Sequence, residues 1–252
     1  MKNIIEKFSL FLVAILLICK ANAIETGKLK AAIFHIAPWG YVNSNKKVVG
    51  IEYDIIKAIS SDINEEIEVV LVPYKRMISM LEHGDADFSI FFRSEKSENV
   101  GIPLVKWGEL DIIVIGLKNN HIRSYSDLSN QRIAVRLGGY FDDRFDQDQS
   151  LRKITYANYA DGIKSLKKIE VTAIVGTAAT LYYEFKKQGI SISELGQPFL
   201  LSHKEDWLHF SKLSKRANKQ RKIKNSVKKL IENGTFNEIF STYLPKEWEH
   251  KK

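Results

Sequence analysis

Short apolar runs alternate along this chain with segments in which apolar residues recur every three to four positions. In the segment 51–63, for example, five isoleucines share one face of a helix, a spacing typical of an amphipathic helix. The pattern predicts strands at 28–36, 66–73, 86–92, 108–118, 131–139, 171–176, 197–202 and 207–214. It predicts helices at 51–63, 75–84, 162–169 and 178–189. Strands that alternate with helices indicate an α/β fold.

The C-terminal part predicts two further helices around the sequence Asn-Gly-Thr at 233–235. Gly234 is expected to end the first helix, because glycine readily adopts the left-handed conformation found there. Thr235 is expected to cap the second helix, with Glu238 completing a capping box.

The first 23 residues read as a secretory signal peptide, not as part of the fold. Lys2 and Lys7 precede an apolar run at 8–18, and Ala-Asn-Ala at 21–23 is a typical cleavage site. The run is too short to span a bilayer. Lipoprotein attachment at Cys19 is a disfavoured alternative, because a large residue precedes it. Cleavage would remove the only cysteine, so we expect a periplasmic protein without disulfides.

The basic charge of the chain is concentrated in one segment. The net charge is +8, of which residues 1–23 contribute +2, so the remaining chain carries +6. Much of it lies at 212–229, where Ile223 and Val227 begin an apolar helical stripe and no aromatic residue interrupts the basic ones. Nucleic-acid binding would need aromatics or a recognisable module. A solvated helix face is the favoured interpretation, and no nucleic-acid partner is expected.

Motifs for metal or covalent chemistry are absent from the sequence. There is no His-Glu-x-x-His, no phosphate-binding glycine loop and no nucleophile elbow. We interpret His35 as a packed strand residue. The aspartates at 142–149 lack the spacing and glycine of a calcium loop, so a solvated loop is expected there. The expectation is therefore no catalytic residue, no metal and no cofactor.

Five segments, in order, carry a family resemblance over most of the chain. They are APWGYV at 37–42, VVGIEYDIIKAI at 48–59, HGDADFSIFF at 83–92, SYSDLSNQRIAVRLGG at 124–139 and IENGTFNEIFSTYL at 231–244. Together they make the chain resemble a divergent member of the periplasmic solute-binding proteins of family 3, the polar amino-acid type that serves ABC transporters.

This resemblance implies an α/β, two-lobed, type II periplasmic-binding-protein-like fold with a hinge. Lobe 1 would comprise 24–113 and 208–252, and lobe 2 would comprise 114–207. Such proteins close on a small-molecule ligand. A monomer that serves an ABC permease in the inner membrane is implied.

The resemblance also places a ligand site whose charged contacts differ from those of the family. In amino-acid-binding members, a Ser or Thr is followed five residues later by an Arg that binds the ligand carboxylate. Ser94 matches the hydroxyl, but Asn99 stands in place of the arginine. Thr177 stands where an aspartate normally binds the ligand ammonium. Burying a zwitterion without these partners is costly, so an ordinary amino acid is not expected.

Other residues suggest an aromatic-lined pocket for an anionic or aromatic solute. The full set of predicted ligand-binding residues is Trp39, Tyr74, Phe92, Arg93, Ser94, Asn99, Arg136, Gly139, Tyr140 and Thr177. Three of these have simpler interpretations. Phe92 is equally well explained by core packing, and Arg93 is better explained by a surface or interlobe salt bridge. Arg136 is evenly balanced between ligand binding and a structural role.

Two other functions remain open. One is a periplasmic enzyme on the same fold, similar to cyclohexadienyl dehydratases, although no acidic residue stands at the matched positions. The other is a ligand sensor that works with a separate membrane receptor. A non-enzymatic binding protein for ABC-type transport is the leading hypothesis.

Overall fold

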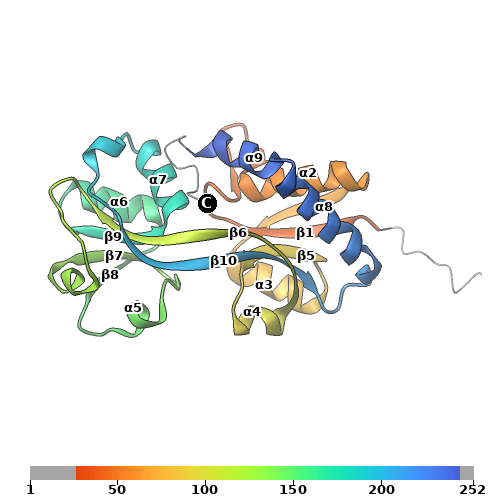
Figure 1. The fold of residues 1–252 in the computed structure, drawn as a ribbon, viewed down its shortest axis with the longest axis horizontal. Coiled ribbons are helices and arrows are strands. Elements are labelled where there is room, and N and C mark those ends of the chain that lie inside the picture. Colours follow the sequence, from red (N-terminus) through yellow and green to blue (C-terminus); the bar gives the residue numbers. More distant parts are fainter. Residues whose placement is uncertain (1–26, 245–252) are drawn as a thin grey trace, which may run out of the picture.

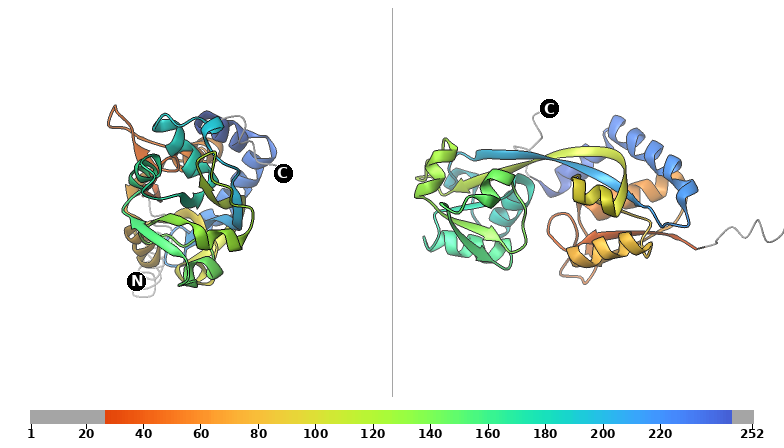
Figure 2. Two further views of the ribbon diagram at one scale, coloured as in Figure 1. Left: turned by 90° about the vertical axis from the view of Figure 1, so that its left-hand side faces the viewer. Right: turned by 90° about the horizontal axis from the view of Figure 1, so that it is seen from below.

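The protein forms two bodies joined by a pair of long strands, as Figure 1 and Figure 2 show. This computed structural model describes residues 27–244. The predicted signal peptide at 1–23, with Cys19 and the cleavage site, lies outside the described residues.

One mixed sheet runs through both bodies, in the strand order β4-β1-β5-β10-β6-β9-β7-β8. Its strands are β1 (Leu29–Phe34), β4 (Ile67–Val72), β5 (Phe88–Phe92), β6 (Gly101–Gly116), β7 (Arg132–Arg136), β8 (Arg152–Tyr156), β9 (Ala173–Thr177) and β10 (Phe199–Ser211). A separate hairpin is formed by β2 (Tyr41–Val42) and β3 (Val48–Val49). We call the body with β1, β4 and β5 lobe 1, and the body with β7, β8 and β9 lobe 2.

Helices cover both faces of the sheet in each lobe. They are α2 (Ile51–Ile63), α3 (Tyr74–His83), α4 (Glu95–Val100), α5 (Asp143–Gln147), α6 (Tyr159–Lys167), α7 (Ala178–Lys187), α8 (Gln220–Glu232) and α9 (Thr235–Tyr243). Short 3-10 turns are η1 (Tyr125–Asn130), η2 (Ile192–Glu194) and η3 (Ala217–Lys219). In lobe 1, α2, α8 and α9 lie on one face and α3 and α4 on the other (Figure 1). In lobe 2, α6 and α7 lie opposite α5.

The isoleucine spacing explains how α2 docks. All five isoleucines of α2 are buried, and they join Phe88 and Phe210 of the sheet in one hydrophobic cluster. Met77 and Leu81 of α3 bury against the opposite face. Lobe 2 has its own clusters on its two faces. Each lobe therefore has a separate core, as expected for the two-lobed α/β fold predicted from the sequence.

Strand pairing fixes how the two lobes face each other. β6 runs from lobe 1 to lobe 2, and β10 returns antiparallel to it. β5 is antiparallel to β10, with Phe92 paired to Asp206, and β9 is antiparallel to β6, with Thr177 paired to Ile112. The parallel strands of lobe 1 therefore end toward lobe 2, and those of lobe 2 end toward lobe 1. Ligands of α/β sheets bind at such carboxyl ends.

The prediction of two strands at 197–202 and 207–214 is wrong, because both belong to β10. Residues 203–206 continue the pairing with β6 without a break in the ladder. Their side chains are mostly polar because this part of β10 crosses between the lobes. A polar stretch of this kind shows no strand periodicity, so the sequence did not predict that the strand continues through it.

At the junction of α8 and α9, the prediction for Gly234 is confirmed and the predicted capping box is not. Gly234 follows the end of α8 with a φ of 85°, and its N–H bonds the carbonyl of Ile231. It is also the N-cap of α9, so Thr235 is the first helical residue and the predicted capping box is not formed. The Thr235 hydroxyl donates to the side-chain oxygen of Asn233 instead.

Two segments for which the sequence predicts no helix contain one. Residues 95–100 form α4, and part of the aspartate-rich stretch forms α5, whose N-cap is Asp142. Asp146 accepts backbone N–H groups from Phe141 and Asp142. The aspartates thus serve the local backbone. Among residues 27–244, no group of three or more His, Cys, Asp or Glu is arranged to bind a metal ion.

The lobe boundaries predicted at 113/114 and 207/208 stay a prediction. In the described part of the chain, no helix has both the length and the apolar composition needed to cross a bilayer.

Candidate functional site

The carboxyl edge of lobe 1 presents an aromatic wall. Tyr74 is the first residue of α3, is 48% exposed and packs edge-on against Phe34 at the end of β1, with 5.6 Å between ring centroids. Phe92 ends β5, is half-buried and contacts hydrophobic clusters of both lobes. His35 follows β1 and is exposed, so its interpretation as a packed strand residue is wrong.

Arg93 already has partners within lobe 1. Its Nε donates to Glu98 Oε1 at 2.6 Å, and its guanidinium carbon lies 4.6 Å from the ring centroid of Trp207. This is the salt bridge that the sequence favoured for Arg93. Its ligand role stays a prediction, because contact with a solute would have to compete with Glu98.

Ser94 and Asn99 lie at the two ends of α4. Ser94 is the N-cap, and its hydroxyl accepts the backbone N–H of Ser97, whose own hydroxyl accepts the N–H of Ser94. Asn99 is exposed near the C-terminus of α4, where its carbonyl accepts from Lys212. The Ser94 hydroxyl therefore has a structural role here, and ligand contacts by both residues stay predictions.

Ser94→Ala is expected to lower the free energy of unfolding by about 1 kcal/mol, the typical loss for a removed N-cap. Urea unfolding measures this, and Ser94→Thr is the matched control because threonine can also cap. Unchanged stability in the alanine variant would contradict the capping role.

Trp39 and Thr177 both form a hydrogen bond with Thr180, and the bond from Trp39 joins the two lobes. Trp39 follows β1 in lobe 1 and is buried, and its indole N–H donates to Thr180 Oγ1 of α7 at 2.9 Å. Thr177 is the N-cap of α7 and donates to the same oxygen at 2.7 Å. The two predicted residues thus lie near each other, engaged in this link. A ligand role for either stays a prediction.

The carboxyl edge of lobe 2 carries an arginine without a partner. Arg136 ends β7 and is half-buried, and no residue within 27–244 forms a hydrogen bond or ion pair with its guanidinium. It lies close to Tyr159 of α6: burial raises the pKa of Tyr159 to about 12, and the charge of Arg136 opposes that rise. Arg136 therefore offers an uncommitted guanidinium at this edge.

Gly139 and Tyr140 lie in the loop after β7. Tyr140 is exposed, its hydroxyl bonds Asp143, and Lys204 Nζ of β10 lies 4.4 Å from its ring centroid. A side chain at Gly139 would meet the ring of Phe141, so glycine keeps this loop compact. Both residues stay predicted ligand contacts.

Sequence reasoning missed two buried acids beside the wall of lobe 1. Glu52, in the first turn of α2, is 1% exposed, and Asp206 of β10 is 3% exposed. Burial raises the pKa of Asp206 to about 8, opposed by the backbone N–H of Trp207 and the indole N–H of Trp107. Burial, and then the charge of Asp206, raises the pKa of Glu52 well above its usual range.

A buried acid gives no periodic signal in the sequence. Glu52 directly follows Ile51, the first residue of the apolar face of α2. Asp206 lies in a polar stretch that has the composition of a loop. Only the pairing of Asp206 with Phe92 brings it to the carboxyl edge of lobe 1.

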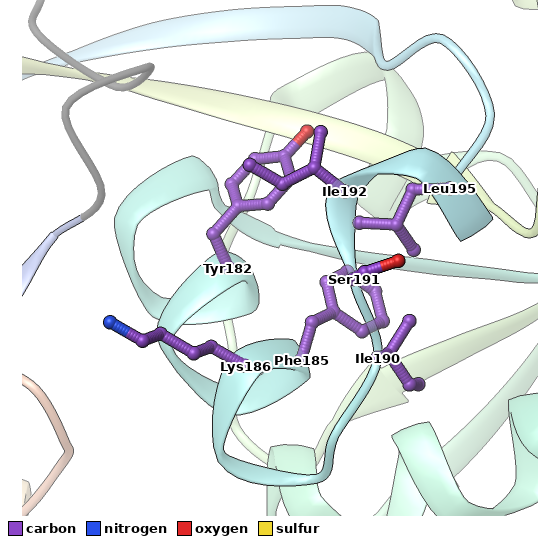
Figure 3. A pocket seen from close by; sticks show the side chains of 7 residues that line it. All are labelled: Tyr182, Phe185, Lys186, Ile190, Ser191, Ile192 and Leu195. Atoms are coloured by element: carbon purple, nitrogen blue, oxygen red, sulfur yellow. The ribbon is translucent and has the colours of Figure 1, made fainter.

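Two of the cavities formed by the described residues lie elsewhere, and no predicted site residue lines either of them. The first, of about 130 Å³, lies between α7 and the segment 190–195, where Phe185, Ile190 and Leu195 give it an apolar lining (Figure 3). The second, of about 460 Å³, lies between Tyr41 of lobe 1, α7 of lobe 2, and Thr242 and Tyr243. The facing sheet edges are the better candidate site, because the chemically distinctive residues gather there.

Comparison with protein families gives one match over most of the chain. Residues 31–246 match the model of the bacterial extracellular solute-binding proteins, family 3.

Comparison with individual proteins agrees in fold. The chain is 22% identical to the probable amino-acid-binding protein YxeM of Bacillus subtilis, over 92% of this chain and 91% of that protein. A histidine kinase sensor domain similar to periplasmic binding proteins superposes with a TM-score of 0.72 at 14% identity, covering 86% of this chain and 96% of the other. A substrate-binding protein of an amino-acid ABC transporter gives 0.69 at 16% identity, covering 87% and 100%.

Proposed function

Because the chain belongs to the bacterial extracellular solute-binding proteins, family 3, we propose that it captures a small solute between the facing edges of its two lobes and serves ABC-type uptake. The proposed protein is a periplasmic monomer that hands its solute to an inner-membrane permease. Bending of the two connecting strands would bring the edges together.

The unpartnered Arg136 carries the proposal for the solute. A half-buried guanidinium loses hydration, and it regains that free energy best by binding a carboxylate or phosphate through paired N–H donors. No acid in the described part of the chain pairs with Arg136. An anionic group on the solute would fill this role at the edge of lobe 2.

The opposite edge supports an aromatic or apolar part in the same solute. Tyr74 exposes ring surface there and is supported edge-on by Phe34, and rings pack well against flat apolar groups. Asn99 and Thr177 stand where the resemblance expects the charged contacts to an amino acid. We therefore propose a small anionic or aromatic solute in place of an ordinary α-amino acid.

Native mass spectrometry of the purified protein tests whether a solute is retained, and isothermal titration then measures its affinity. We expect an anionic or aromatic compound to bind, and glutamine, arginine and glutamate to show no binding at micromolar concentration. Micromolar binding of any of these three amino acids would refute the proposed solute class, although the capture function would stand.

We propose that capture involves no chemical step. The acids that the structure places near the wall of lobe 1, Glu52 and Asp206, are both nearly fully buried, whereas a proton donor must reach its substrate. Incubation with prephenate or arogenate should leave both compounds unchanged. Turnover of either would favour the enzyme alternative.

A further inference from the structure

Three buried polar atoms without a partner cluster where the connecting strands join lobe 1. They are Glu52 Oε2, Asp206 Oδ1 and Trp107 Nε1, and none forms a hydrogen bond within the described residues. The indole N–H of Trp107 lies close enough to lower the pKa of Asp206, but its geometry falls short of a hydrogen bond. Buried unpaired polar atoms are costly, so such a cluster calls for an explanation.

The cluster sits at an irregularity of the strand pair. Asp206 pairs with Gly108 and the next residue, Trp207, pairs with Lys106, so Trp107 is the extra residue of a β-bulge. Bulges bend a strand and mark places where its direction changes. This bulge lies beside the end of β5, where Asp206 pairs with Phe92, so β6 and β10 leave lobe 1 toward lobe 2 from this point.

Among residues 27–244, no cation neutralises the two acids. Lys106 pairs with Glu109 and Glu205, which point away from Asp206 because neighbouring strand residues face opposite sides. Arg93 is held by Glu98 and Trp207, and Lys204 lies over the ring of Tyr140.

The other titratable groups that the structure describes around the acids supply no positive charge either. From α3 the neutral phenol of Tyr74 faces Asp206. In α2, the carboxylate of Asp54 accepts a hydrogen bond from the hydroxyl of Tyr243. Two carboxyls without a counter-cation, buried close enough to influence each other, cannot both ionise cheaply.

We propose that Glu52 and Asp206 form a buried proton-binding pair that controls how firmly the connecting strands are anchored to lobe 1. With protons bound, the pair is uncharged or shares one negative charge. When both carboxyls ionise, their repulsion and lost hydration act directly on the bulge at Trp107. The linker between the lobes then loosens without any change in covalent structure.

The direction of the pH effect follows from proton linkage. In the unfolded chain both carboxyls titrate near pH 4, whereas in the folded chain burial raises both pKa values, that of Asp206 to about 8. The folded state therefore binds more protons between these limits. The stabilisation is fully present below about pH 4 and is lost as the pH rises through about 8.

Thermal unfolding of the full chain between pH 5 and pH 8.5 tests the pair. We expect the wild-type Tm to fall by about 8–16 °C over this range, because about three of the roughly four pH units between the unfolded and folded pKa values of Asp206 lie within it. Asp206→Asn should remove at least half of the fall, and Glu52→Gln combined with Asp206→Asn should remove the rest. Asp85→Asn and Glu82→Gln, at exposed positions of the same lobe, are matched controls that should keep the wild-type slope.

Two further measurements locate the effect and guard against variants that fail to fold. The rate of amide exchange in peptides from β6 and β10 around the bulge, corrected for intrinsic rates, should be at least tenfold higher at pH 8.5 than at pH 5. An infrared band of a protonated carboxyl should persist at pH 6 in Glu184→Gln, a variant that removes another buried carboxyl with a raised pKa. A missing band, or Tm slopes equal in the double variant and wild type, would overturn the proposal.

Discussion

Trp39→Ala is expected to lower the free energy of unfolding by about 3–5 kcal/mol, the range for truncating a large buried aromatic side chain. Trp39 is 3% exposed and packs against Trp107 and Phe240, with ring centroids 6.3 and 6.0 Å away. Its indole N–H also holds Thr180 of the other lobe. Equilibrium unfolding in urea measures the loss.

Two matched variants separate packing from the interlobe hydrogen bond. Trp39→Phe keeps most of the ring contacts and loses the donor to Thr180, so it should cost less than Trp39→Ala, with about 1 kcal/mol from the hydrogen bond. Val42→Ala, at an exposed position of the same segment, should change stability by less than about 0.5 kcal/mol. Equal losses in Trp39→Ala and Val42→Ala would contradict the packing described for Trp39.

Arg136→Ala is expected to weaken binding of the anionic solute recovered by native mass spectrometry by about 10- to 100-fold, because a hydrogen bond to a charged group contributes about 1.5–3 kcal/mol. The guanidinium is uncommitted, so its whole interaction is free for the solute. Isothermal titration of the variant against wild type gives the ratio of the two Kd values.

Arg93→Ala is the comparison that gives this result its meaning. Arg93 is already bound by Glu98 and stacked on Trp207, so its removal should change the Kd by less than about threefold. Arg136→Lys should recover only part of the affinity, since lysine keeps the charge but not the paired donors. A larger loss from Arg93→Ala than from Arg136→Ala would reverse the assignment of the anion contact.

Sequence periodicity predicted those parts of the fold in which one face is buried and the other is solvated. Helix α2 begins and ends where the isoleucine spacing indicates, because its apolar stripe alone decides how it packs. β10 was divided in two, because a strand that crosses between lobes has polar side chains in its middle and no apolar face there. α4 was missed because its six residues are stabilised by capping at Ser94 more than by burial.

Residues of the candidate site could be predicted where they lie at strand ends. They could not be predicted where their role depends on which other side chains they contact. Tyr74 directly follows a predicted strand and Arg136 lies in the second half of another, so their position at the facing edges could be anticipated. Arg93 also follows a strand, but its engagement with Glu98 depends on a helix that the sequence did not reveal. Asp206 lies at the carboxyl edge of lobe 1 only because it pairs with Phe92. The register between strands that are far apart in the sequence cannot be predicted from local sequence patterns.

Lobe 1 is assembled from segments far apart in the chain, and this sets the order in which the molecule can be built. β5 has β10 as its neighbour, and α2 packs against α8, so both wait for residues synthesised last. The strands and helices of lobe 2, in contrast, lie in one continuous stretch and can form as soon as it emerges. A nascent chain therefore cannot offer two facing edges until nearly its whole length has been made, so no solute can be trapped by an unfinished molecule.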